Sequence, residues 1–323
     1  MQVKRILIAE VNWLGDVLFS TPFIRAVRNN FPDAHIACMI MPRIREILEG
    51  NPYINEIITY DEKNLKKRKF DMAFLLHRSF SRALAMYMAG IPERIGYYTF
   101  KRSLLLTEKP KPPDALSMHR AEFYLGLAKS VGLKTDNKGC DFFISKQDSV
   151  WAATVIQPGR KTVIFNPGGN WMPKRWSKEN FIELGRILLS EFKDNIRIVL
   201  SGSAKDVELA QEINSALQNK AIITCGKTTL KQSAALFKKS DLVISADSGP
   251  LHIAVSVGAK AIAIFGPTSL KITGPYKADK DRVVTFCKDM DCRIPCYNDK
   301  CADYKCMAAI TPKEVFETAK RLL

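Results

Sequence analysis

The stretch Thr162-Val163-Ile164-Phe165-Asn166 decides the fold, because this short apolar run leads directly into the Gly-rich turn Pro167-Gly168-Gly169. An amphipathic segment of helical length follows at residues 178–192, and a second β-branched run follows at residues 196–201. Buried strands that alternate with amphipathic helices are typical of a parallel sheet with helices on its faces. The stretch therefore predicts a β-α-β unit.

The same alternation extends from this unit in both directions. Toward the C-terminus it predicts strands at residues 221–225, 241–245 and 261–265, and helices at residues 206–217, 230–238 and 250–257. Toward the N-terminus it predicts strands at residues 5–9, 36–40, 56–60, 72–76 and 94–97, and helices at residues 16–30, 79–88 and 118–131. We therefore expect an α/β protein with two parallel-sheet domains, which agrees with a length of 323 residues at about 150 residues per domain.

The boundary between the two domains is expected at the polar segment 157–161, which precedes the strand at residues 162–166. The first domain would then comprise residues 1–157 and the second residues 158–323. Near the C-terminus, Thr311 and Pro312 precede an apolar pattern that includes Val315 and Phe316. This pattern predicts a capped amphipathic helix, and one expected arrangement packs it back on the first domain.

The charge of the chain points to an anionic partner, because 49 Lys and Arg residues oppose 33 Asp and Glu residues and leave +16 at pH 7. Nucleic acids, anionic lipids and phosphorylated small molecules all attract such a surplus. The chain has no recognisable nucleic-acid-binding motif, so a nucleic acid is not expected. The first apolar run ends at Glu10, which is too short for a secretory signal, and no run reaches the length of a membrane span. A cytoplasmic protein is expected.

The turn after the first predicted strand, Trp13-Leu14-Gly15-Asp16, is the first candidate for chemistry. Ligands of open α/β sheets bind at the carboxyl ends of the strands, where this turn would lie. Gly15 would let the backbone approach a ligand, and Asp16 would supply a carboxylate. The alternative is that Asp16 only caps the following helix.

The Gly-rich turn of the second half is the next candidate. Gly168 and Gly169 are followed by Lys174 and Arg175, so backbone amides and cations could converge on a phosphate. The turn lacks both the Gly-Lys-Ser/Thr ending of a P-loop and the spacing of a dinucleotide fingerprint, so neither an ATPase nor an NAD enzyme is indicated. The alternative is a solvated loop with a buried Trp.

A third candidate begins where another predicted strand of the second half ends, at Asp247-Ser248-Gly249-Pro250-Leu251-His252. Helix starts of this kind present unbonded amides and the positive end of the helix dipole, which suits a diphosphate. The alternative is that Asp247 or Ser248 is an N-cap and that His252 is a buried residue bonded to backbone. Because both turns of the second half follow strands of one domain, we expect them at the same sheet edge.

Together these motifs resemble those of the ADP-heptose:lipopolysaccharide heptosyltransferases, glycosyltransferase family 9, and among them the heptosyltransferase II type. The resemblance covers nearly the whole chain. It rests on six stretches in the family's order, which are Trp13-Leu14-Gly15-Asp16, Ser79-Phe80 with residues 89–96, Pro167-Gly168-Gly169 with Lys174-Arg175-Trp176, residues 202–206, residues 247–252, and Phe265-Gly266-Pro267-Thr268.

The resemblance implies a GT-B architecture, in which two Rossmann-like domains place their parallel sheets across a cleft. The first domain would bind the acceptor, and the second would bind ADP-heptose as the donor. The implied reaction is an inverting transfer of heptose to the inner core oligosaccharide of lipopolysaccharide, with no metal or other cofactor required for catalysis. The domains are expected to close over the donor, because water would otherwise compete with the acceptor.

The resemblance also assigns roles to individual residues. The catalytic aspartate of the family falls on Asp16, which would act as the general base toward a sugar hydroxyl. Its phosphate-binding lysine falls on Lys174, which together with the helix start at Ser248 would stabilise the departing ADP. The other implied donor-side residues are Gly168, Gly169, Asp206, Asp247, Gly249 and His252.

An acidic glycolipid acceptor would account for the positive charge, because the lipopolysaccharide core carries Kdo carboxylates and lipid A phosphates. Gly15, Arg78 and Arg120 are the expected acceptor-side residues. The cationic run at residues 66–69 is interpreted as a solvated face rather than an acceptor contact. The enzyme would then be peripheral on the cytoplasmic face of the inner membrane.

The cysteines of the C-terminal region depart from the best-known members of the family. Five of the eight cysteines lie between residues 287 and 306, in the pattern C-x4-C-x3-C-x4-C-x4-C. Structural zinc ligands usually have two to four residues between them. The last four are therefore a candidate structural metal site, namely Cys292, Cys296, Cys301 and Cys306. Disulfides and unmodified thiols remain alternatives, and none of these cysteines is assigned to catalysis.

Two other functions remain open at this point. The same fold and mechanism could serve another nucleotide sugar or another glycan acceptor, because the motifs describe the nucleotide end better than the sugar. The chain could also be a non-catalytic polyanion-binding protein, which only the net charge suggests.

Overall fold

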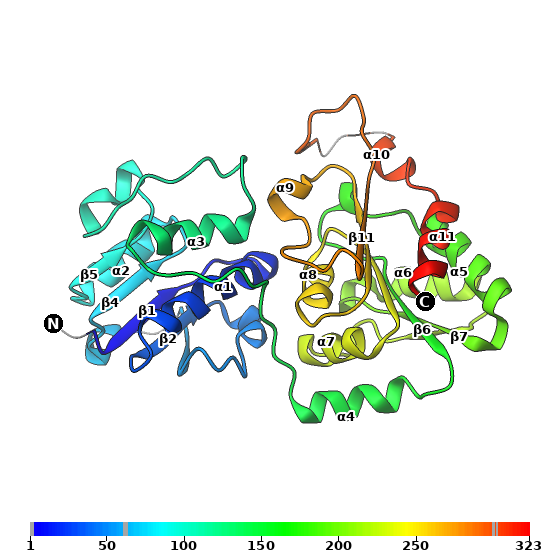
Figure 1. The fold of residues 1–323 in the computed structure, drawn as a ribbon, viewed down its shortest axis with the longest axis horizontal. Helices are drawn as coiled ribbons and strands as arrows, with labels where there is room; N and C mark the ends of the chain where they lie inside the picture. Colours follow the sequence, from blue (N-terminus) through cyan, green and yellow to red (C-terminus); the bar gives the residue numbers. More distant parts are fainter. Residues whose placement is uncertain (1–2, 61–63, 299–300, 302) are drawn as a thin grey trace. The chain divides into compact units, whose positions relative to one another are not determined.

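The computed structural model describes residues 3–60, 64–298, 301 and 303–323. These residues divide into two compact units, one up to Phe143 and the other from Ile144 onward. Each unit is built on its own parallel sheet, as Figure 1 shows. The division lies before the expected boundary at residue 157, because helix α4 (Lys146–Val155) packs on helix α7 (Leu230–Lys239) of the second unit.

The first unit has a five-stranded sheet in the order β3-β2-β1-β4-β5, and every described pair is parallel. Its central strand β1 is apolar along its length, because helices cover both faces of the sheet. The strands are β1 (Arg5–Ala9), β2 (His35–Ile40), β3 (Glu56–Thr59), β4 (Met72–Leu75) and β5 (Glu93–Ile95). The helices are α1 (Leu14–Asn30), α2 (Phe80–Met88) and α3 (Arg120–Ser130), with 3-10 turns η1 (Pro42–Ile47), η2 (Leu65–Arg68) and η3 (Phe100–Leu105).

The second unit has a six-stranded parallel sheet in the order β11-β10-β9-β6-β7-β8. Its strands are β6 (Lys161–Asn166), β7 (Ile196–Leu200), β8 (Ala221–Ile223), β9 (Leu242–Ala246), β10 (Ala261–Phe265) and β11 (Val283–Cys287). Its further helices are α5 (Lys178–Phe192), α6 (Val207–Ala216), α8 (Gly249–Ser256), α9 (Leu270–Thr273), α10 (Lys305–Ala308) and α11 (Pro312–Leu322), with 3-10 turns η4 (Met172–Lys174), η5 (Lys193–Asn195) and η6 (Ala204–Asp206). The sequence pattern did not predict α4 or β11.

The C-terminal helix α11 belongs to the core of the second unit. It begins with a capping box between Thr311 and Glu314, as its sequence predicts. Its apolar residues Val315 and Phe316 join the core cluster of this unit, and the indole nitrogen of Trp176 donates to the carbonyl of Ile310 at 2.8 Å. The apolar face that was expected to lie on the first domain is thus used within the second unit.

The strand order of each sheet contains a point where the chain reverses its direction of winding. In the first sheet this point lies between β1 and β4, and in the second it lies between β6 and β9. The connections that leave two such strands diverge to opposite faces, which opens a crevice at the carboxyl ends of the strands. The turns singled out in the sequence follow β1, β6 and β9, so each of them lies at a switch point.

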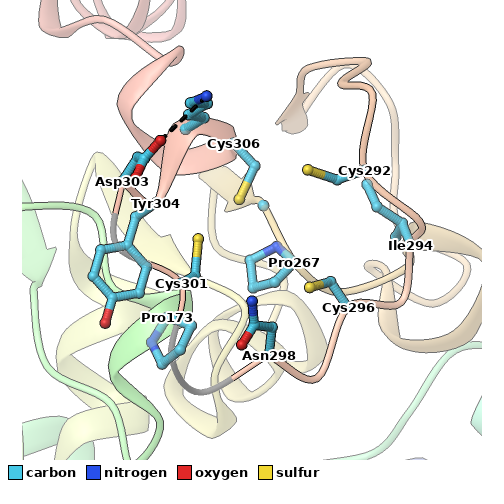
Figure 2. Close-up of a pocket in the computed structure, with 12 residues that line it drawn as sticks. Pro173, Pro267, Cys292, Ile294, Cys296, Asn298, Cys301, Asp303, Tyr304 and Cys306 are labelled. Atoms are coloured by element: carbon cyan, nitrogen blue, oxygen red, sulfur yellow. Dashed lines mark ion pairs between the residues drawn. The ribbon is translucent and has the colours of Figure 1, made fainter.

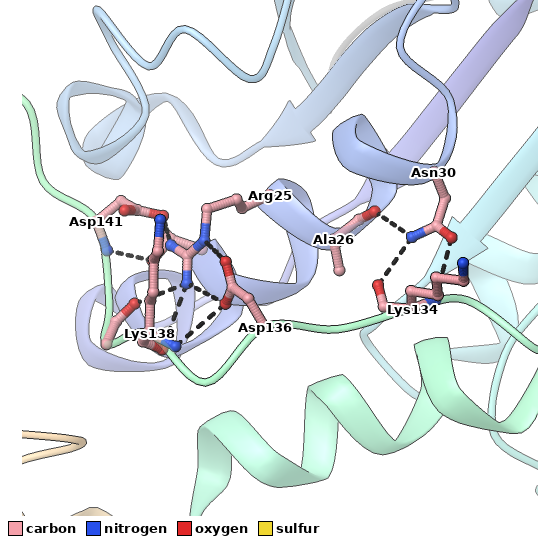
Figure 3. Close-up of polar contacts among 9 residues, drawn as sticks. Arg25, Ala26, Asn30, Lys134, Asp136, Lys138 and Asp141 are labelled. Carbon is pink, nitrogen blue, oxygen red and sulfur yellow. Dashed lines mark hydrogen bonds and ion pairs between the residues drawn. The ribbon is translucent and has the colours of Figure 1, made fainter.

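The last stretch of the first unit is fastened to helix α1 by a buried cation, Arg25 (Figure 3). Arg25 is 2% exposed, pairs with Asp136 at 2.8 Å and with Asp141, and donates to the carbonyls of Lys138 and Gly139. One turn further along α1, the Asn30 side chain exchanges two hydrogen bonds with the backbone of Lys134. A buried cation requires such partners, so the segment that leads toward the second unit starts from a fixed position.

Candidate active site

The first polar cluster is centred on Asp16, which lies in the first turn of α1 directly after β1. The side chain of Asp16 is 28% exposed, so one side of the carboxylate is accessible to a ligand. The N-cap position is occupied by Trp13 with no side-chain cap bond, so Asp16 is not the N-cap that was its alternative role. Gly15 precedes it in the same helical turn and is partly exposed.

Two side chains of α3 hold the Asp16 carboxylate. The hydroxyl of Tyr124 donates to Oδ1 at 3.2 Å, and Nε of Arg120 lies 3.8 Å from the same oxygen. Burial, followed by the charge of Asp16, raises the pKa of Tyr124 well above its ordinary value, so the hydroxyl stays a donor. The packing of α3 on α1 thus brings together Asp16 and the predicted acceptor-side residue Arg120.

A buried carboxyl group, Glu10, lies at the end of β1 beside this cluster, and the sequence pattern did not single it out as a functional residue. Oε2 of Glu10 accepts from Ser20 at 2.9 Å, whereas Oε1 has no hydrogen-bond partner among the described residues. Burial raises the pKa of Glu10 to about 7. Its charge also contributes to the raised pKa of Tyr124, which places Glu10 in the electrostatic environment of the Asp16 cluster.

The other cations of the first unit have different roles. Arg78 is exposed after β4, at the switch point opposite Asp16. Arg102 is 0% exposed and donates to the carbonyls of Tyr97 and His77, so it is a structural cation. Burial, together with the charge of Arg78, lowers the pKa of Arg102 to about 10. Arg78 is therefore the accessible member of this pair.

The second polar cluster joins the Gly-rich turn after β6 to the turn after β9. Nζ of Lys174 lies 2.8 Å from Oδ2 of Asp247, and Nε2 of His252 lies 3.1 Å from Oδ1 of the same carboxylate. The hydroxyl of Thr273 donates to Oδ2 at 3.2 Å. The expectation that the two turns meet at one sheet edge is therefore confirmed by the pairing of β6 with β9 and by the contact between their turns.

The electrostatics of this cluster keep Asp247 ionised. Burial alone would raise its pKa, but the hydrogen bond and charge of His252, followed by those of Lys174, outweigh burial and hold the pKa well below its usual range. The side chain of Asp247 is 3% exposed, whereas that of Lys174 is 28% exposed. The buried carboxylate of Asp247 therefore holds the Lys174 ammonium group in place through the ion pair, while the ammonium group itself remains accessible to solvent.

The N-terminus of α8 continues the same cluster. Ser248 occupies the N-cap without a side-chain cap bond, and Gly249 and Pro250 form the first turn. The amide of Asn166 donates to Ser245 at 3.2 Å and to Ser248 at 3.4 Å, which ties the end of β6 to this helix start. The positive end of the helix dipole thus lies on the same side as Lys174.

The glycines of the Gly-rich turn have packing roles that other residues could not fill. A Cβ at Gly168 would lie 2.2 Å from Oδ1 of Asp206, so only glycine fits over this buried carboxylate. Oδ2 of Asp206 accepts from the backbone and hydroxyl of Ser203 in a capping box. The carbonyl of Gly169 accepts from Arg175 at 2.9 Å. Asp206, one of the expected donor-side residues, thus packs against the turn and supports it.

The four cysteines predicted as metal ligands line one cavity of the second unit, which Pro173, the residue before Lys174, also lines. All eight cysteines of the chain are thiols. Across the described residues, no group of three or more His, Cys, Asp or Glu side chains is placed closely enough to hold a metal ion as it stands. The described residues also include no helix with the length and apolar character needed to cross a bilayer.

Comparison with known proteins identifies the family. The pattern of glycosyltransferase family 9 (heptosyltransferase) matches residues 61–302. Lipopolysaccharide heptosyltransferase 2 of Salmonella typhimurium is 28% identical over 87% of this chain and 88% of that protein. Lipooligosaccharide heptosyltransferase 2 of Campylobacter jejuni is 26% identical over 99% of this chain and 98% of that protein.

Solved structures agree with this assignment. The E. coli ADP-heptose lipopolysaccharide heptosyltransferase II superimposes with a TM-score of 0.84, at 26% identity over 98% of both chains. A family 9 glycosyltransferase from Veillonella parvula superimposes with a TM-score of 0.85, at 24% identity over 100% of this chain and 98% of that chain, and supports the fold. The fold is therefore that of the GT-B glycosyltransferases. The matched residues include Lys174 and Asp247, and the chain belongs to glycosyltransferase family 9, the heptosyltransferases.

Proposed function

We propose that this enzyme transfers heptose from ADP-heptose to the inner core of lipopolysaccharide by an inverting displacement. The observation that carries the proposal is the Lys174–Asp247–His252 cluster at the switch point of the second sheet. An accessible ammonium group fixed beside a helix N-terminus is suited to a diphosphate. The family membership and the heptosyltransferase names of the relatives supply the sugar.

The donor half of the reaction follows from the charges in the second unit. As the bond between the anomeric carbon and the phosphate oxygen breaks, ADP acquires negative charge. Lys174 and the amides at the start of α8 offset this charge without having to reorient, because Asp247 already fixes the ammonium group. His252 positions Asp247, and Gly168 lets the Gly-rich turn pack closely on Asp206.

The acceptor half follows from the Asp16 cluster. A hydroxyl of the acceptor attacks the anomeric carbon from the face opposite ADP, its proton passes to the Asp16 carboxylate, and the configuration at the anomeric carbon inverts. Tyr124 and Arg120 bond or pair with Oδ1 and so hold the carboxylate in position. Gly15, Arg78 and Arg120 are the residues that we assign to acceptor binding.

A panel of nucleotide sugars tests the proposed donor. We expect nucleotide release from ADP-heptose to depend on a lipid A–Kdo acceptor and to exceed release from ADP-glucose, UDP-glucose and GDP-mannose. The assay follows ADP, UDP or GDP in the presence and absence of acceptor. Faster acceptor-dependent release from another donor would support the alternative in which the fold and mechanism serve a different sugar.

The first unit also exposes an apolar surface that suits a membrane-bound acceptor. Helix α2 presents Phe80, Leu84, Tyr87 and Met88 to solvent, a spacing that forms one helical stripe, although Ala83 and Met86 on the other side are buried. The turn η3, which packs on α2, adds two more apolar side chains, Phe100 and Leu104, whose exposed fractions are 85% and 90%.

Cations border this apolar stripe. Arg78 and Lys101 are exposed beside it, and the guanidinium of Arg94 lies 5.4 Å from the ring centre of Tyr87. Apolar side chains bordered by cations bind the interface of an anionic bilayer, because they combine apolar burial with attraction to the headgroups. We therefore infer that α2 and η3 attach the enzyme peripherally to an anionic lipid surface, the inner face of the inner membrane.

Vesicle binding tests this attachment. We expect the enzyme to sediment with vesicles that contain phosphatidylglycerol, and the double variant Phe100→Ser, Leu104→Ser to bind about tenfold more weakly, because each side chain loses its burial in the bilayer. Val150→Ser, a change of an exposed apolar residue in the second unit, is the control. Equal binding by the double variant and the wild type would contradict the assignment.

A further inference from the structure

A cavity of about 250 Å³ in the second unit is lined by Cys292, Cys296, Cys301 and Cys306. Figure 2 shows that the four sulfur atoms turn toward the same space, although the residues come from separate turns of the C-terminal segment. The fifth cysteine of the region, Cys287, lies exposed at the end of β11 and is not part of this wall. Four thiols facing one space need a chemical reason, because isolated thiols pack as small apolar groups.

Two of the four cysteines are anchored to the core of the unit. The backbone amide of Cys296 donates to the carbonyl of Pro267 at 2.8 Å. Cys306 belongs to α10, whose next residue Met307 is buried in the core cluster. A Cβ at Gly266 would lie 3.0 Å from the sulfur of Cys306, so the loop after β10 approaches this helix closely. The cavity is therefore bounded by fixed elements.

The spacing of the four cysteines along the chain also suits a metal ion. The separations of three, four and four residues along the chain fall within the range seen for structural zinc ligands.

We propose that Cys292, Cys296, Cys301 and Cys306 together bind one Zn²⁺ ion as thiolates. Binding forms four zinc–sulfur bonds and releases the four thiol protons to solvent. Bonds of about 2.3 Å would draw the sulfur atoms inward from the cavity wall, since as placed they do not meet at one point. Zinc suits the site because the ligands are all soft thiolates in tetrahedral number. Lys305 on the cavity wall is paired with Asp303, which also lines the cavity, at 3.2 Å.

The site would brace the turn that carries Lys174. The ring of Tyr297, next to Cys296, lies 6.3 Å from the ring of Trp171, and the Lys174 ammonium lies 6.0 Å from that same indole ring. Pro173, which precedes Lys174, lines the cavity itself. Metal binding would thus fix the position of Lys174, a consequence that rests on the proposed function, whereas metal binding itself does not.

Metal analysis of the purified full-length protein tests the site. We expect about one zinc ion per chain, and we expect the four thiols to react with a thiol reagent only after the zinc is displaced. The variant Cys301→Ser should lose most of the zinc, whereas Cys287→Ser, which changes an exposed cysteine outside the cavity, should retain it. Activity is not needed for either readout, so failure of the proposed glycosyl transfer would leave this test intact.

Three results would overturn the proposal. The first is that wild-type protein remains free of zinc after incubation with zinc chloride under reducing conditions. This result would overturn the proposal whether or not the variants fold. The second is the presence of disulfide bonds among the four cysteines in the protein as isolated from the cytoplasm. Iron with acid-labile sulfide in place of zinc would show a cluster rather than the proposed ion.

Discussion

Replacing Asp16 with asparagine should lower the rate constant for transfer by about 10³-fold. The amide keeps the size of the side chain and can still accept from Tyr124, whose hydroxyl lies 3.2 Å from Oδ1. It cannot take the proton of the acceptor hydroxyl, so the loss should appear in kcat. The measurement is the rate of heptose transfer at saturating donor and acceptor, together with the dissociation constant for ADP.

The dissociation constant for ADP separates loss of the base from loss of the fold. Asp16 lies in the first unit, whereas the proposed diphosphate contacts lie in the second, so ADP should bind to the variant as it does to the wild type. Asp33→Asn, the same chemical change at an exposed position of the first unit, should retain full activity. An Asp16→Asn enzyme that transfers heptose at the wild-type rate would refute the assignment of the base.

Replacing Lys174 with methionine should lower kcat by about 10²-fold and weaken ADP binding. Methionine keeps the length and the apolar stem of the side chain but removes the ammonium group that faces the leaving diphosphate. It also leaves Asp247 with one cationic partner fewer, although His252 and Thr273 still bond to it. Steady-state kinetics with ADP-heptose and calorimetry with ADP measure the two effects.

The matched control for Lys174 is Lys220→Met, which removes an exposed cation of the same unit outside the cluster. This variant should match the wild type in both measurements. Both variants remove one positive charge, so an effect of net charge alone would be the same in both. A larger loss of activity in Lys174→Met than in Lys220→Met would therefore reflect the position of Lys174. Equal kinetics for the two variants would contradict the role of Lys174 in stabilising the departing ADP.

The sequence predicts the two sheets well because their strands are buried on both faces. Strands β6 and β9 contain the apolar runs Val163–Phe165 and Leu242–Ile244 and are followed by turns rich in small residues, and both signals are local. Their adjacency in the sheet places Lys174 beside Asp247, in agreement with the expectation that the two turns lie at one sheet edge. Strand β11 was not predicted, and none of its residues is fully buried.

The domain boundary was expected too late in the chain, although a local signal was present. Ser145 and Asp148 form a capping box at the start of α4, and their three-residue separation is a recognisable helix start. The helix carries few apolar residues in a periodic pattern and buries only Ala152 fully. Its place in the second unit depends on packing against α7, which is a long-range contact that no local pattern shows.

The partners of Asp16 could not be predicted from local sequence. Tyr124 lies 108 residues away along the chain and reaches Asp16 only because α3 packs on α1. The buried state of Arg102 was equally hidden, since an arginine in a cationic stretch suggests an exposed side chain. In both cases the role of a polar residue depends on partners that tertiary packing brings to it.

The most direct test of heptosyl transfer is the structure of the product. Wild-type enzyme, ADP-L-glycero-β-D-manno-heptose and a lipid A–Kdo acceptor should yield ADP and a single α-linked heptose on the acceptor, as read from the anomeric signal in an NMR spectrum. That result shows both the transferred sugar and inversion at the anomeric carbon. A β-linked product, or ADP release without any heptose on the acceptor, would contradict an inverting transfer with Asp16 as the base.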